Sequence, residues 1–238
     1  MSPDQSRSWG PVAASLAVPG LGQLVRGRHH GWTYVISEAF LITTYGVASA
    51  AGNRHRDLYR DLAFVIARGP FAPTIRDTTF EYFEQMGKFL ESGPFDTDPG
   101  PLLVPPSDER SFNGSIWALA QRTFFPDPDR PPPRDSPAYQ AAEAFYRARA
   151  IGPNFQWSWL GSEGEQRRFR SAIEASDQAF QRGTVVLGFV VANHLLSAID
   201  ALIAIRSGGR ALPIRLSLTD LRPSTGGAVR YFTVSTAF

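Results

Sequence analysis

The chain has 238 residues, a formal net charge of +2 and no cysteine. Without cysteine it has no disulfide, no thiolate metal site and no cysteine nucleophile. The small net charge and the lack of a clustered basic face argue against nucleic-acid binding. The mean hydropathy of −0.18 is typical of a soluble protein. That value, however, averages a polar middle region with strongly apolar segments on either side of it.

The first apolar segment, residues 9–25, contains no charged side chain. Pro11 suits the first turn of a helix, whereas Pro19 followed by Gly20 should break or kink one. Irregular backbone at membrane depth has to be covered by protein. We therefore expect this segment to lie on the membrane or to re-enter it, and a straight span is the alternative.

Two longer apolar stretches, residues 31–52 and 183–205, each contain one formal charge, Glu38 in the first and Asp200 in the second. A helix that crosses a membrane needs about 20 residues, so both stretches are long enough. An ionisable group at that depth is costly and normally faces a protein partner. The sequence predicts two transmembrane helices, and the alternative is a soluble all-α domain in which both are core helices.

A cleavable signal sequence is a further alternative for the first stretch. Arg26 and Arg28 precede it, and Ala48-Ser49-Ala50 lies near its end. The apolar run is longer than the core of a typical signal sequence. We therefore expect it to be retained as a membrane helix.

Residues 53–162 are predicted to form a helical extramembrane region with proline-rich loops at 94–112 and 126–137. Asn53 is expected to begin its first helix. A capping box at 78–81, in which a Thr and a Glu side chain bond each other's backbone, is expected to begin the second.

The same region is rich in large aromatic side chains, among them Trp117, Phe155, Trp157 and Trp159. Most such side chains form a core. Any that are exposed would form a docking surface for another protein, because tryptophan and tyrosine are frequent anchors of interfaces.

Residues 163–206 keep a helical apolar pattern without any proline, which predicts one long helix that contains the last span. At 1.5 Å per residue it would be about 66 Å long. The apolar pattern of residues 207–238 alternates, which predicts a short β-hairpin. The predicted fold is therefore mainly α, divided into residues 1–52, 53–162, 163–206 and 207–238.

Polar residues follow one face of the last predicted helix. Asn193, Ser197 and Asp200 are spaced at i, i+4 and i+7, and Glu38 and Tyr45 share one face of the earlier helix. The favoured interpretation is hydrogen bonding between the helices, which would fix their register. The alternative is a path for a proton or an ion along facing carboxylates.

His194 lies beside this polar face and could in principle ligate the metal of a haem or a chlorophyll. No second histidine supports such a cofactor, so a hydrogen bond to Glu38 or to a backbone carbonyl is the better prediction. His29, His30 and His55 have no ligand partners at metal-binding spacing. Phosphate-loop and nucleophile-elbow motifs are also absent. We expect no metal, no cofactor and no enzymatic activity.

Two short motifs resemble a family of uncharacterised bacterial membrane proteins. The first is the P-G-x-G-Q segment at residues 19–23, followed by Gly27 and Gly31. The second is the N-H-x-x-S-x-x-D-A run at residues 193–201, in the last predicted helix, and residues 82–89 are also similar to the middle region of that family. The resemblance implies a membrane location and assigns no activity.

The favoured function is a non-catalytic accessory or scaffold subunit of a larger envelope or bioenergetic complex, whose partners are membrane lipid and other membrane proteins. The arginines outside the middle region favour a bacterial inner membrane with both termini inside and the middle region in the periplasm. The first alternative is a small transport or ion-coupling component that uses Glu38 and Asp200. The second is a soluble all-α domain.

Overall fold

The computed structural model describes residues 9–73, 82–98, 100–206, 214–221 and 229–236, the last two ranges by their backbone only. The chain is mainly helical and divides into two compact units. Unit 1 contains residues 1–47 and 182–238, and unit 2 contains residues 48–181. The boundaries between the two units fall inside the two longest helices.

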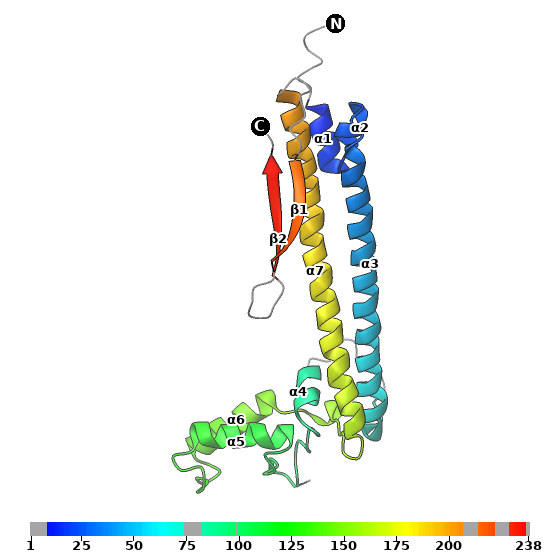
Figure 1. The fold of residues 1–238 in the computed structure, drawn as a ribbon. Helices are drawn as coiled ribbons and strands as arrows, with labels where there is room; N and C mark the ends of the chain where they lie inside the picture. The colour runs from blue at the N-terminus through cyan, green and yellow to red at the C-terminus, as the bar shows by residue number, and fades with distance from the viewer. Residues whose placement is uncertain (1–8, 74–81, 99, 207–213, 222–228, 237–238) are drawn as a thin grey trace. The chain divides into compact units, whose positions relative to one another are not determined.

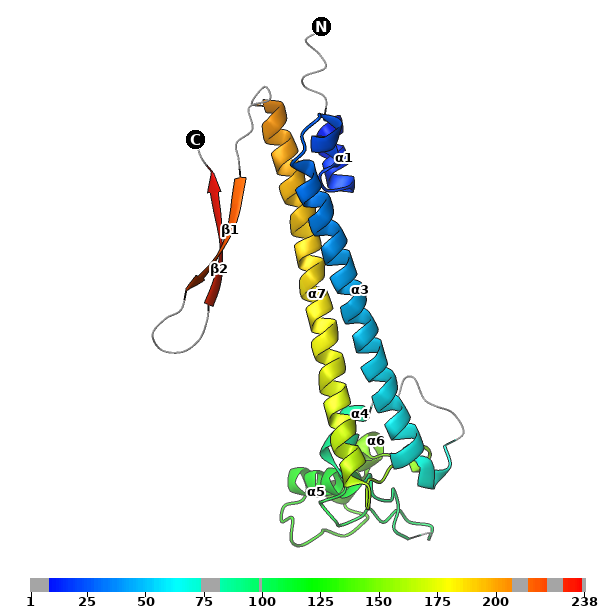
Figure 2. The ribbon, with the colours of Figure 1, turned by 45° about the vertical axis from the view of Figure 1, so that its right-hand side comes forward.

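Unit 1 begins with two short helices, α1 (Gly10–Ala17) and α2 (Leu21–Val25). The break predicted at Pro19 and Gly20 lies between them. Figures 1 and 2 both place α1 beside the start of α3 and the C-terminal end of α7. Val12 of α1 packs there against the small side chains Ala198 and Ala201 of α7.

The other two helices that contribute to unit 1 are long. Helix α3 spans Gly31–Leu62, and helix α7 spans Glu163–Arg206 as one continuous element of 44 residues, as the sequence predicted. In unit 1 the two helices are antiparallel, because contacts to α7 move from Asp200 back to Asn193 while the contacting residues advance from His30 to Glu38.

The predicted helix start at Asn53 is wrong. Helix α3 continues through it to Leu62 and then widens into a π-helical turn at Ala63–Ala67. Gly52, just before Asn53, lies inside the helix and leaves space for a side chain of α7. A Cβ atom there would lie 2.9 Å from the ring of Phe180 on α7.

Unit 2 also contains α4 (Phe83–Lys88), α5 (Phe112–Phe124) and α6 (Pro137–Arg149). The Ser111 and Ser136 side chains cap α5 and α6 by accepting backbone N–H bonds. The capping box predicted at residues 78–81 lies outside the described residues.

Large aromatic side chains fill much of the interior of unit 2. Trp157 and Trp159 are fully buried, and Trp117 is 6% exposed. These three lie in two apolar clusters inside the unit. Phe155 alone of the predicted docking residues is substantially exposed, at 38%.

The C-terminal strands are β1 (Ile214–Leu221) and β2 (Val229–Thr236), paired antiparallel with Ile214 opposite Thr236. The connection predicted to turn the hairpin, residues 222–228, lies outside the described residues. The hairpin as a whole therefore stays a prediction.

Two helices are long and apolar enough to cross a membrane, namely Gly31–Ala67 and Glu163–Arg206. Only 6% of the most apolar 18-residue window in the first, and 22% of that in the second, is buried within the chain. A core helix of a soluble protein would bury most of such a window. Length, composition and exposure together suggest a membrane location.

Candidate functional site

The polar side chains of unit 1 meet where α1, α2, α3 and α7 converge. The glycines of the P-G-x-G-Q segment allow the backbones of these helices to come close together. Gly20 has a φ of +89°, and a Cβ atom on it would lie 2.1 Å from the carbonyl oxygen of Gly31. A Cβ atom on Gly22 would lie 1.9 Å from the carbonyl oxygen of Pro11. Both positions therefore require glycine, because the backbones of three segments touch there.

Gln23, the last residue of that segment, is 1% exposed, and its amide makes four hydrogen bonds. Its Nε2 donates to the Ser197 carbonyl oxygen at 2.8 Å and to Asp200 Oδ2 at 2.9 Å. Its Oε1 accepts from the hydroxyls of Ser15 at 2.8 Å and Ser197 at 3.4 Å. Because a carbonyl only accepts, the Ser197 bond fixes which end of the amide is the nitrogen.

The two serines connect this amide to the backbone of the short helices. The Ser197 hydroxyl accepts from the Gly20 N–H at 2.7 Å, and the Ser15 hydroxyl accepts from the Gly22 N–H at 3.0 Å. Each hydroxyl thus accepts one hydrogen bond from a backbone N–H and donates one to Gln23. Such a saturated buried network holds one arrangement of its segments, since any shift leaves a buried polar group unpaired.

Asp200 is 8% exposed and has two partners on the same oxygen. Besides Gln23, the His30 Nε2 lies 3.0 Å from its Oδ2. The His30 side chain is 43% exposed, whereas the Asp200 side chain is 12% exposed. His30 therefore connects the buried carboxylate to the surface of the unit.

Glu38 forms a separate group of contacts with α7. Its Oε2 accepts from Asn193 Nδ2 at 2.9 Å, and its Oε1 lies 3.2 Å from His194 Nε2. Asn193 also donates to the backbone carbonyl of Tyr34 at 3.0 Å. Glu38 and Asp200 are thus each paired with a histidine from another segment.

Both ring nitrogens of His194 are in hydrogen bonds. Nδ1 lies 2.6 Å from the carbonyl oxygen of Leu16, at the C-terminal end of α1, and Nε2 faces Glu38. The sequence had favoured a bond to Glu38 or to a backbone carbonyl, and both are present. No ring nitrogen keeps a lone pair directed at open space, so this arrangement does not fit a tetrapyrrole ligand. Within the described residues, no group of three or more His, Cys, Asp or Glu side chains could hold a metal ion.

Five of the six residues predicted to make polar contacts between helices do so, in two separate groups. Glu38 contacts Asn193 and His194, whereas Ser197 and Asp200 contact the N-terminal segment. Tyr45 lies two turns beyond Glu38 on α3, is 38% exposed and belongs to neither group. Sequence reasoning missed Ser15, Gln23 and His30. They lie in or beside the short N-terminal helices, where no long periodic pattern marks a buried face. The close glycine spacing around Gln23 was the available signal.

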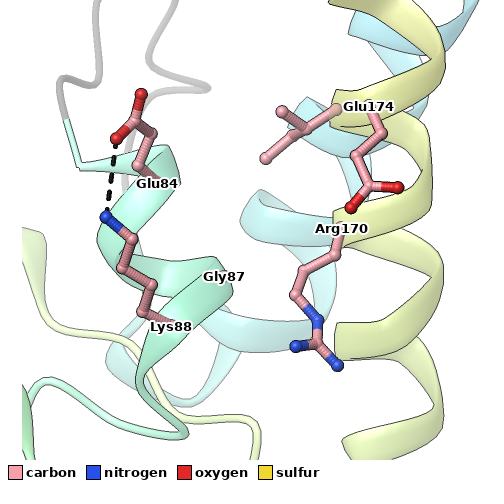
Figure 3. A pocket seen from close by; sticks show the side chains of 6 residues that line it. Glu84, Gly87, Lys88, Arg170 and Glu174 are labelled. Atoms are coloured by element: carbon pink, nitrogen blue, oxygen red, sulfur yellow. Dashed lines mark ion pairs between the residues drawn. The ribbon is translucent and has the colours of Figure 1, made fainter.

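Unit 2 has a more open feature, a hollow of about 320 Å³ between α4 and α7. Figure 3 shows Lys88 directed toward Glu84 on α4, with Arg170 and Glu174 across from them on α7. The Lys88–Glu84 pair is 3.8 Å long, and both side chains are mostly exposed. Exposed pairs of this kind contribute little energy, and a lining of both charge signs selects no ligand class.

Comparison with known proteins adds no assignment, because no protein-family model, no curated protein and no solved structure matches the chain.

Proposed function

We propose that the chain is a non-catalytic integral-membrane subunit that anchors and scaffolds a larger membrane complex. One observation carries the proposal. In unit 1 Glu38 of α3 bonds Asn193 and His194 of α7, and Ser197 and Asp200 of α7 bond the N-terminal segment. Large apolar side chains cover the outward surfaces of both helices. The most exposed of these include Ile36, Phe40 and Val47 on α3 and Val185, Val191 and Ile199 on α7.

Physical chemistry favours a membrane anchor for such a pair. In hydrocarbon, apolar side chains need no cover, whereas carboxyl, amide and imidazole groups must find partners within the protein. The proposed location is a bacterial inner membrane. The arginine distribution around the spans favours unit 2 in the periplasm.

The scaffold role has less support from unit 2 than its sequence suggested. Its tryptophans are buried in the interior of the unit. Phe155 is therefore the remaining candidate contact from the predicted docking group. The guanidinium of Arg68 lies 5.6 Å from the centre of the Phe155 ring. The exposed apolar surfaces of the spans are then the main candidate contacts for other membrane proteins.

A specific observation also favours the alternative, a small proton- or ion-coupling component. Both acids in the spans are held by histidines, and the half-exposed His30 gives Asp200 a route to the surface. Histidine is the side chain that most readily exchanges a proton near neutral pH.

Alkaline carbonate extraction tests the anchor. The chain should stay in washed membranes, and release of the intact chain would instead support a soluble all-α domain.

Purification in a mild detergent then separates the two membrane functions, with Glu38→Gln and Asp200→Asn as matched variants. A scaffold should co-purify with its partners at fixed stoichiometry in the wild type and in both variants. A chain that purifies alone, and whose reconstituted proton or ion flux is lost in the same variants, would overturn the scaffold proposal in favour of coupling.

A further inference from the structure

Helix α1 runs antiparallel to the C-terminal end of α7, so its two ends lie at different depths along that helix. Trp9, the N-cap of α1, lines a cleft together with the last turn of α7, which ends at Arg206. Leu16, at the other end of α1, has its carbonyl oxygen 2.6 Å from His194 Nδ1. The separation of His194 from Arg206 along α7 is about 18 Å at the usual helical rise. In a membrane whose hydrocarbon is about 30 Å thick, α1 therefore enters at the Arg206 end and reaches about the middle.

The cleft at that end has a volume of about 230 Å³ and is lined by Trp9, Leu202, Ile205 and Arg206. Leu202 and Ile205 form its floor, because they also pack against the apolar cluster around Val12. Trp9 is 67% exposed, so its ring forms an open side wall. Three of the four lining side chains are thus apolar, and the fourth is an arginine.

Arg206 lies at the boundary of an apolar stretch. Residues 183–205 contain no basic side chain, and Arg206 is the last residue of α7. An arginine at the end of a membrane helix extends its charged group to the level of the lipid headgroups, and tryptophan is enriched at the same level. The floor of the cleft therefore faces the outer part of the hydrocarbon, and its charge faces the lipid phosphates.

The charged side chains near this end of unit 1 are mainly basic. Arg26 and Arg28 come directly after α2, which returns along α7 to the level of Asp200. Asp200 is the nearest acidic side chain in the described part of the unit, and it is already hydrogen-bonded to His30. Clustered arginines beside a membrane helix attract anionic lipids. The local charge therefore favours a lipid with a net negative headgroup.

We propose that this cleft binds an anionic phospholipid, with one acyl chain against the apolar lining and the phosphate on Arg206. A guanidinium group can donate two parallel hydrogen bonds to a phosphate, which fixes the headgroup in orientation as well as in place. A zwitterionic phospholipid offers the same phosphate but adds a cation that the nearby arginines repel. The inference rests on the membrane anchor of the proposed function, and it names the lipid class that the anchor binds.

Tryptophan fluorescence measures the occupant of the cleft, because brominated acyl chains quench a ring that they touch. The full chain with Trp32→Phe is reconstituted in vesicles of phosphatidylglycerol, which is anionic, and phosphatidylcholine, which is zwitterionic. One lipid or the other carries the bromine. Trp9 is then the exposed tryptophan of the described residues, since those of unit 2 are buried. A variant that also carries Trp9→Phe gives the background to subtract.

Brominated phosphatidylglycerol should quench Trp9 more than brominated phosphatidylcholine does. The relative affinity should favour phosphatidylglycerol by about fivefold, the factor expected for one arginine beside an anionic lipid. Arg206→Gln should remove most of this preference. Arg182→Gln is the matched control, because it removes the same charge at the opposite end of the apolar stretch of α7, and it should leave the preference unchanged.

Equal quenching by the two brominated lipids, or none by either, overturns the proposal. So does a preference that Arg206→Gln and Arg182→Gln lower alike. Loss of quenching when sodium phosphate is added at constant ionic strength would assign the cleft to a free anion instead of a lipid. Carbonate extraction tests the anchor separately. A chain that stays in washed membranes without a lipid preference at Trp9 refutes this inference and leaves the anchor standing.

Native mass spectrometry of the wild-type chain provides a measurement that does not depend on how well a variant folds. The chain is released from detergent micelles that contain equal amounts of the two lipids. It should retain phosphatidylglycerol in preference to phosphatidylcholine. A folded wild-type chain that retains both lipids equally, or neither, would refute a site for an anionic lipid.

Discussion

Gly22→Ala is expected to loosen the packing of α1 against α2. The new methyl group would lie 1.9 Å from the Pro11 carbonyl oxygen and 2.5 Å from Ser15 Oγ. Ordinary van der Waals contact begins at about 3.4 Å, and a backbone carbonyl cannot rotate away as a side chain can. Helix α1 therefore has to move, and the bond from the Gly22 N–H to Ser15 Oγ breaks with it.

The expected size follows from three terms. Overpacking a well-filled site costs about 1–3 kcal/mol, and the lost hydrogen bond costs about 1 kcal/mol. Alanine is favoured over glycine in a helix by about 1 kcal/mol, which offsets part of this. The net loss is about 1–3 kcal/mol, which raises the population of the opened state about 5-fold to 150-fold.

The assay is the labelling rate of a buried cysteine. Val12→Cys replaces a residue of α1 that is 9% exposed and packs against Ala198 and Ala201 of α7. A maleimide reacts with it in detergent only when α1 opens, so the ratio of rates gives the change in opening free energy.

Gly46→Ala is the matched control, because a Cβ atom there meets nothing within 4 Å. It should leave the labelling rate of Val12→Cys unchanged within about twofold, given the small energies of uncrowded substitutions. Equal rates in the Gly22→Ala and Gly46→Ala backgrounds would refute the reasoning that the P-G-x-G-Q glycines are fixed by backbone contact.

Two further predictions concern unit 2. Trp159→Ala should cost about 3–5 kcal/mol of stability, because the ring is fully buried and its Nε1 donates to the Met86 carbonyl oxygen at 2.9 Å. Leu160→Ala next to it, where the side chain is 59% exposed, should cost less than about 0.5 kcal/mol. Similar melting temperatures in the two variants would contradict the burial of Trp159 in the core. Backbone N–H bonds, led by that of Val104, lower the pKa of Asp96 below 3.8, so the stability they add is present above pH 3.8 and is lost as the pH falls through the folded-state pKa. Acid titration of the melting temperature should therefore show a smaller decrease in Asp96→Asn than in the wild type, and parallel decreases would rule this contribution out.

The sequence by itself determined the long elements. A sustained helical pattern without proline predicted α7 from end to end, because each apolar residue of such a pattern reinforces the same face. Lone acids in apolar stretches predicted that Glu38 and the polar face of α7 need partners. The break at Pro19 and Gly20 also followed from local chemistry alone.

Only the tertiary structure decided which partners these groups have. Periodicity places Asp200 on a face of its own helix, but it cannot say that the turn after Pro19 brings Gln23 and His30 to that carboxylate. The same limit explains the misplaced helix start at Asn53. Asn53 resembles a helix start in the sequence, whereas in the fold the helix continues through it and the neighbouring Gly52 makes room for the ring of Phe180. Local patterns determine helices over a few residues, while these contacts join segments more than a hundred residues apart, and they form only when the helices pack.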